Sequence, residues 1–245
     1  EFDDASLQKV VRRSEELAKL APDNPEYVEF LGPQDYLESK TYFDSTAKIT
    51  PDYRAKAAAA SIDPAKAKNL TAAGFLQDNA GFQSMMNTKG LFAYNQATGV
   101  NFTVTMRTED GKGSGWVTRD FNHVAKMDTV AASQIAIDKA VMSQEAKAIE
   151  PGKYTVILEP AASIGLLQNM LGNFGARQAD EGRSFLAKKG GGNKLGEKLV
   201  DERVTVYSDP THPEVPSQTW AGDGLARKKM YWIKNGVVEN LFYSR

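Results

Sequence analysis

Residues 70–124 read LTAAGFLQDNAGFQSMMNTKGLFAYNQATGVNFTVTMRTEDGKGSGWVTRDFNHV. Glycine-containing turns, such as Asn87-Thr88-Lys89-Gly90 and the run from Glu109 to Gly113, separate short β-type segments in this stretch. Such a pattern is typical of an antiparallel meander, and the expected strands are residues 72–76, 82–86, 90–96, 101–107 and 114–122. The sequence from Met127 to Gln144 has a helical pattern, so we expect one helix to cover one face of the sheet.

The sequence before the meander predicts two helices. Apolar residues recur at helical spacing from Ala5 to Leu20, with charged residues between them and Pro22 after them, so we expect an amphipathic helix. Thr50-Pro51-Asp52 has the residues of a helix start and predicts an Ala-rich helix through Ala60. The region from Asp23 to Thr50 shows no clear period, which predicts loop with short extended pieces.

The sequence after the meander predicts a second part of the molecule. Pro151-Gly152 indicates a domain boundary near Glu150, followed by an apolar strand at 154–158 and a helix at 161–174. Further on we expect a strand at 204–207 and a β-hairpin, with strands at 227–233 and 237–243, around Asn235-Gly236. We therefore expect an α/β (α+β) protein with antiparallel sheets flanked by helices. Its parts are a mixed α/β part at 1–150 and the start of a β-rich domain at 151–245.

Composition excludes several classes of protein. The chain has 30 basic and 31 acidic residues, a formal net charge of -1, so no global field attracts nucleic acid. Without cysteine, neither a disulfide framework nor a thiolate site can form in this stretch. No apolar run is long enough for a membrane span, and the start is acidic where a signal peptide is basic. We therefore expect a cytoplasmic protein with no nucleic-acid or membrane partner, and both ends of the chain look cut.

The chain has few residues of the types that carry chemistry. Its two histidines, His123 and His212, lie at the end of a β-type segment and in a Pro-rich turn, so the His-rich signatures of zinc hydrolases cannot form. The acidic pairs Asp180-Glu181 and Asp201-Glu202 stand beside basic residues, as expected of solvated charge.

Two glycine-rich runs superficially resemble phosphate-binding loops. Both lack the Lys-Ser/Thr ending and the strand-to-helix setting of such loops. The run Gly111–Gly115 is better interpreted as a hairpin turn. The run Lys189–Lys194 is either a plain flexible linker or a loop that covers substrate or contacts a partner.

Several segments of the second half occur in an order typical of one known family. Gly152-Lys153-Tyr154-Thr155-Val156-Ile157-Leu158-Glu159-Pro160 leads into Gly165-Leu166-Leu167. The later segments are Gly182-Arg183-Ser184-Phe185-Leu186, Gly196-Glu197-Lys198-Leu199-Val200, Val204-Thr205-Val206, Asp209-Pro210 and Asn235-Gly236-Val237. This series resembles the TldD/PmbA family, whose members were once called modulators of DNA gyrase. Weaker similarity extends through the meander and the helix before Pro151.

The resemblance implies that a zinc-binding helix has lost its ligands. In the TldD branch this helix carries His-Glu-x-x-x-His, which is associated with zinc and with a peptidase acting on unfolded or small peptides. The matching residues here are Gln168-Asn169-Met170-Leu171-Gly172-Asn173. An amide oxygen is a poor zinc ligand beside imidazole, and a neutral Asn cannot take a proton from bound water. The resemblance thus implies no catalytic and no metal-binding residue in this chain, with Gln168, Asn169 and Asn173 as a vestigial site.

The same helix has an apolar stripe that gives it a structural role. Ile164, Leu167, Leu171 and Phe174 recur at helical spacing, so we expect them to pack on a sheet. Gln168 and Asn173 lie about 140° apart on a regular helix, so a joint site would need a local distortion, which Gly172 could permit.

Chains without the histidines belong to the PmbA or TldE branch, which this chain resembles best. The resemblance implies a non-catalytic subunit that pairs with a TldD-like subunit, or with itself, around a peptide substrate, with zinc only in the TldD-type partner. One departure is the turn Ala221–Gly224, where only Asp223 and Gly224 match the acidic turn of the family. Two alternatives remain open: a stand-alone divergent hydrolase or metallopeptidase of the same fold, and an assembly module that uses the Asn235-Gly236 hairpin for strand addition.

Overall fold

The computed structural model describes residues 2–244. They form two compact units, residues 2–30 and residues 31–244. The first unit contains the expected amphipathic helix, α1 (Asp4–Leu20), in which no residue is buried. Its N-terminus is capped by Asp3, whose carboxylate accepts a hydrogen bond from the Ser6 amide at 2.9 Å.

The larger unit begins with a three-stranded antiparallel sheet. Its strands are β1 (Leu70–Met86), β2 (Phe92–Thr108) and β3 (Ser114–Phe121), in the order β1-β2-β3. The prediction of five short strands was wrong in number, because β1 and β2 pair without interruption from Leu70 opposite Thr108 to Met86 opposite Phe92. The backbone hydrogen bonds of this ladder keep even the Gly- and Asn-containing centre of each strand extended.

Between the β1–β2 turn and residue 100 of β2, the sheet is only a two-stranded ribbon of β1 and β2. Strand β3 pairs only with Val100–Arg107 of β2, so β1 and β2 continue without it. The extended residues around Thr41 run alongside the ribbon, where the Thr98 amide donates to the Thr41 carbonyl at 2.9 Å.

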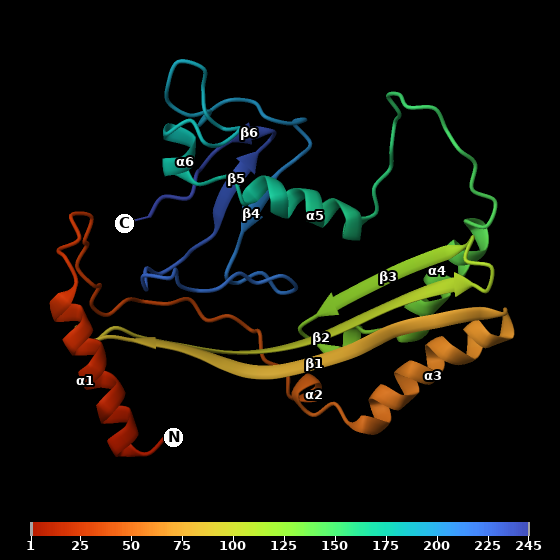
Figure 1. Ribbon diagram of the computed structural model, residues 1–245, viewed down its shortest axis with the longest axis horizontal. Helices are drawn as coiled ribbons and strands as arrows, with labels where there is room; N and C mark the ends of the chain where they lie inside the picture. Colours follow the sequence, from red (N-terminus) through yellow and green to blue (C-terminus); the bar gives the residue numbers. More distant parts are fainter. Residues whose placement is uncertain (1, 245) are drawn as a thin grey trace. The chain divides into compact units, whose positions relative to one another are not determined.

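Two helices cover one face of this sheet (Figure 1). They are α3 (Pro51–Ala67), which extends seven residues past the expected end at Ala60, and α4 (Thr129–Met142), which lies within the predicted helix. The core beneath them contains Phe102, Val104, Met106, Val117, Ala136, Ile137 and Ala140. Two shorter helices, α2 (Asp44–Ala47) and the 3-10 turn η1 (Val124–Lys126), join the edge of this layer, where Thr46 Oγ1 donates to the Asn122 carbonyl at 3.2 Å.

A second, smaller antiparallel sheet follows, built from β4 (Val206–Ser208), β5 (Met230–Lys234) and β6 (Val237–Val238) in that order. The predicted hairpin is present with shorter strands. Asn235 and Gly236 have φ values of 49° and 79°, as a type I′ turn requires. The sheet packs with α6 (Ala176–Asp180) and the end of α5 (Pro160–Leu171) around Phe174, Leu186, Ile233, Val238 and Leu241. These two sheets with their helices give the expected antiparallel α/β architecture.

The predicted strand Tyr154–Leu158 is wrong. Residues 153–159 have no regular secondary structure, and none of their backbone groups pairs with a strand within residues 2–244. Val156 and Ile157 are 72% and 97% exposed. The β-branched residues favour an extended chain, but a strand also needs a partner for its hydrogen bonds.

No helix among residues 2–244 has the length and apolar character needed to cross a bilayer.

Candidate functional site

The three residues of the predicted vestigial site lie at the C-terminal end of α5. Gln168 and Asn169 are on the last turn of the helix, whereas Asn173 lies just beyond its last residue, Leu171. All three are exposed. Asn173 Nδ2 donates to the Asn169 carbonyl at 2.9 Å, so this amide satisfies one of the free carbonyl groups at the helix end. The structure therefore places the three residues near each other in the chain without enclosing them in a pocket.

The apolar stripe of α5 packs only at its end. Phe174 is fully buried, and Leu171 packs partly against the second core. Ile164 is 51% exposed, and α5 contains no buried residue. The expectation that all four stripe residues pack on a sheet was therefore wrong for Ile164, because the first two turns of the helix extend beyond the small sheet's core.

The residues present do not fit a zinc ion. Within residues 2–244, no three His, Cys, Asp or Glu side chains come together as a metal site would require. The His123 ring stacks on Phe43, with ring centroids 4.3 Å apart. His212 Nδ1 accepts hydrogen bonds from the amides of Glu214 and Val215 in its turn. Both histidines thus have local structural partners.

One member of each acidic pair, Glu181 and Asp201, forms an exposed ion pair with arginine. Hydrogen bonds from the guanidinium groups of Arg177 and then Arg183 lower the pKa of Glu181. A hydrogen bond from Arg203 likewise lowers the pKa of Asp201. Carboxylates held in the ionised form by arginine are poor proton donors near neutral pH, so these pairs have the character expected of solvated charge.

The glycine-rich runs are turns. Gly111–Gly115 lies in and after the tight β2–β3 connection, where the Thr108 amide donates to the Gly113 carbonyl at 3.0 Å. The second run closes on itself through the Lys188 amide and the Gly192 carbonyl, 2.9 Å apart. Asn193 Nδ2 also donates to Asp180 Oδ1 at 2.7 Å. Neither run leads into a helix as a phosphate-binding loop does.

The turn Ala221–Gly224 is tied to the extended segment that precedes α2. Tyr36 Oη donates to the Gly224 carbonyl at 2.7 Å, and Gly224 has a φ of 86°. Burial, followed by the negative charge of Asp223, raises the pKa of Tyr36. The hydroxyl therefore stays protonated and keeps donating. The two residues that match the family thus lie in a fixed turn.

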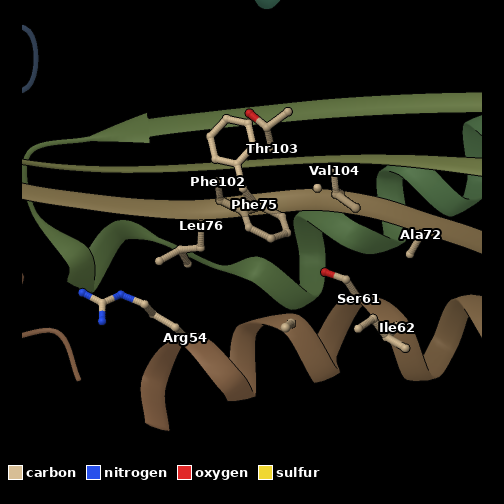
Figure 2. A pocket seen from close by; sticks show the side chains of 11 residues that line it. Arg54, Ser61, Ile62, Ala72, Phe75, Leu76, Phe102, Thr103 and Val104 are labelled. Carbon is tan, nitrogen blue, oxygen red and sulfur yellow. The ribbon is translucent and has the colours of Figure 1, made fainter. Parts of the chain in front are cut away.

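Two pockets were not anticipated from the sequence. The first, about 180 Å³, lies between α3 and the sheet and is lined mainly by apolar side chains such as Ile62, Leu76 and Phe102 (Figure 2). Arg54 lies at its rim, where its guanidinium makes two hydrogen bonds to Asp78 at 2.8 and 2.9 Å. Small residues on α3 leave this space, but the sequence alone does not show which of its alanines face the sheet.

The second pocket, about 400 Å³, lies over the β1–β2 ribbon beneath residues 216–218. Asn79, Gln83, Asn95 and Gln218 line it. The amides that alternate with glycine and alanine on β1 and β2 could have indicated a polar surface on the ribbon. The loop that completes the pocket is more than a hundred residues away in the sequence, so the pocket itself could not be predicted.

Comparisons with known proteins match a family model over the C-terminal part of the chain and relatives over more of its length. Residues 151–245 match the model of the PmbA/TldA metallopeptidase C-terminal domain. An uncharacterized protein of Methanocaldococcus jannaschii is 27% identical over 221 residues, which are 89% of this chain and 51% of that protein. A protein named metalloprotease from Methanothermobacter thermautotrophicus is 26% identical over 171 residues, 66% of this chain and 36% of its own.

Solved structures share the fold. A modulator of DNA gyrase from Thermotoga maritima, so titled, superposes with a TM-score of 0.81 at 22% identity, over 94% of this chain and 54% of its own. TldE from Thermococcus kodakarensis superposes with a TM-score of 0.78 at 20% identity, over 99% of this chain and 55% of its own. This chain spans about half the length of the first relative it matches.

The family match begins at residue 151, whereas the compact units divide at residue 30; the domain boundary near Glu150 stays a prediction. Residues 151–245 thus match a PmbA/TldA metallopeptidase C-terminal domain, and the fold of the chain is similar to that of the solved structures titled modulator of DNA gyrase and TldE.

Proposed function

We propose that this chain is a TldE/PmbA-like, non-catalytic subunit of a TldD/TldE-type metallopeptidase complex that acts on unfolded or small peptides. The observation that carries the proposal is the set Gln168, Asn169 and Asn173 at the positions of His-Glu-x-x-x-His. An amide cannot replace the general base, because it has no proton affinity near neutral pH. On this proposal, zinc and the water-activating carboxylate belong to a TldD-type partner.

The environment of the three amides supports the same view. Their exposure leaves them in water, where an amide competes poorly with solvent for a metal ion. Asn173 is engaged with the helix end through Asn169. A hydrolytic site needs ligands that converge in a partly dry pocket, and these side chains lack that arrangement.

The assembly-module alternative has less support from the geometry. A hairpin that recruits another strand needs free backbone groups along its outer edge. The Val238 amide already donates to Glu197, and the Gly236 amide donates to Val204, at 3.0 and 2.9 Å. The outer edge of β6 is thus occupied within the chain.

Co-expression with a TldD-like protein tests the proposal. Size-exclusion chromatography should show one complex of the two chains, and cleavage of an unfolded peptide should be faster with the complex than with the TldD-like protein alone. If the chains elute separately and cleavage is unchanged, the proposal is wrong. One zinc ion per molecule of this chain purified by itself would instead favour the stand-alone metallopeptidase.

A further inference from the structure

We propose that the pocket over the β1–β2 ribbon is a binding subsite for an uncharged stretch of peptide main chain with small side chains. The ligand class rests on the function proposed above, and the site itself rests on the lining of the pocket. The volume of about 400 Å³ lies in the range of ~300–1,000 Å³ that is typical of ligand pockets.

The walls of this pocket combine neutral amides and hydroxyls with the apolar side chains of Phe82 and Pro216. Asn79, Gln83, Asn95 and Gln218 each carry one carbonyl oxygen and one NH₂ group, and no charged residue lines the pocket. A peptide unit has the same pair of groups, one N–H and one C=O, so each can be matched by an amide side chain. A charged ligand would lose its hydration and gain no ion pair here. The chemistry therefore favours a neutral peptide over a charged one.

The floor of the pocket is made of small residues. Gly81 lines it together with Ala97, and a Cβ added at Gly81 would meet no atom within 4 Å. A bound main chain can therefore approach the ribbon closely at this point. The neighbouring Gly99 has a different role, because Asn79 Oδ1 would lie 2.5 Å from a Cβ there. The absence of a side chain at Gly99 thus lets the Asn79 amide lie across the ribbon.

A loop from the C-terminal part completes the pocket. Gln218 Nε2 donates to Gln83 Oε1 at 3.1 Å, which joins the loop to the ribbon. On the other side, Thr41 Oγ1 donates to the Gln96 carbonyl at 2.5 Å and fixes the extended segment beside β2. Ser217 Oγ, also in the lining, is buried without a hydrogen-bond partner among residues 2–244. Hydrogen bonds thus fix both sides of the pocket, while the Ser217 hydroxyl has a hydrogen bond still to make.

Binding of labelled, end-capped short peptides to the full chain, followed by fluorescence anisotropy, tests this subsite. The probe is a peptide of Gly, Ala, Ser and Asn; the comparison peptides carry Lys or Asp at the central positions. We expect Gly81→Val to weaken binding of the neutral peptide about tenfold or more, because the valine fills open space above the floor. The control is Gly165→Ala, at a second glycine where an added Cβ meets nothing. Both variants should fold, which their thermal transitions will check.

A charge change provides the second arm. Gln83→Glu should shift the preference towards the Lys-containing peptide by roughly fivefold, the scale of a partly exposed ion pair. Gln8→Glu on α1 adds the same charge elsewhere and should leave the preference unchanged. Equal binding of neutral and charged peptides, equal binding by wild type and Gly81→Val, or binding of a neutral oligosaccharide in place of the peptide would each overturn the subsite.

Complex formation with a TldD-like protein is measured separately on the same samples. Loss of peptide binding in Gly81→Val without any complex supports the subsite and contradicts the proposed subunit role. If the complex forms and Gly81→Val leaves peptide binding unchanged, the result supports the subunit role and contradicts the subsite.

Discussion

Helices α4 and α5 have 14 and 12 residues and opposite environments. Helix α4 buries Ala132, Ser133, Ala136, Ile137 and Ala140 against the first sheet, whereas α5 buries none of its residues. Packing therefore constrains the sequence of α4 but leaves most of α5 free to vary. This difference is consistent with the proposal that the exposed amides of α5 stand at the positions of lost metal ligands, because substitutions there would leave the fold intact.

The largest expected effect comes from truncating one isoleucine on each helix. Ile137 on α4 is 0% exposed, and Ile164 on α5 is 51% exposed. Ile137→Ala should lower the free energy of unfolding by about 3 kcal/mol, because it removes buried methyl groups and leaves a cavity. Ile164→Ala should change it by less than about 0.5 kcal/mol. Chemical denaturation of both variants measures this; similar losses would mean that α5 is packed after all.

A glycine beside or within each helix gives the next contrast. A Cβ at Gly115 would lie 2.0 Å from the Ala136 carbonyl of α4, whereas one at Gly165 in α5 would meet nothing. Gly115→Ala should destabilise the protein by about 2 kcal/mol through overpacking. Gly165→Ala should stabilise it by about 0.5–1 kcal/mol through helix propensity. Thermal unfolding of the two variants would show shifts of opposite sign, and a shared sign would contradict the comparison.

Two serines give a smaller difference. Ser133 Oγ on α4 shares a buried hydrogen bond of 2.8 Å with Ser61 Oγ of α3. Ser163 Oγ on α5 reaches the Leu158 carbonyl only at 3.5 Å. Ser133→Ala should cost about 1 kcal/mol, because Ser61 loses a buried partner. Ser163→Ala should have an effect below about 0.5 kcal/mol, and urea titrations will compare the two.

The smallest effect is expected at the proposed vestigial site of α5. The triple variant Gln168→His, Asn169→Glu and Asn173→His changes only exposed side chains. We expect a stability within about 0.5 kcal/mol of the wild type, measured by the same titrations. A loss of several kcal/mol would show that these positions are constrained by packing in the way that α4 is.

The sequence was sufficient for the helices with clear start signals and an apolar face. Asp128 accepts from the Ala131 amide and begins α4 within the range predicted from its apolar pattern. Thr50 caps α3 in the same way. Local hydrogen bonds and periodicity act within a few residues, so they are visible in the sequence.

Long-range pairing was not visible in the same way. The residues at the centre of β1, including Gly74 and Gly81, have weak strand preference, but β2 pairs with them throughout. Tyr154–Leu158 has strong strand preference and no partner among the described residues. Strand formation depends on a partner that the local sequence does not specify.

The candidate site also has features that the sequence indicates and features that only the structure shows. The identities of Gln168, Asn169 and Asn173 came from the family resemblance, but their exposure came only from the structure. The amide-lined pocket needed Gln218, which the chain brings to Gln83 from 135 residues away. No local pattern contains that contact.

The central proposal is that this chain forms a complex with a TldD-like partner and does not supply the catalytic groups of that complex. The most direct test is peptide cleavage by the complex with a TldD-like partner, comparing a substitution in each subunit. Asn169→Ala in this chain should leave the cleavage rate unchanged, whereas replacing the glutamate of the partner's His-Glu-x-x-x-His should abolish cleavage. Loss of cleavage with Asn169→Ala, or full cleavage after the partner's glutamate is replaced, would contradict the account.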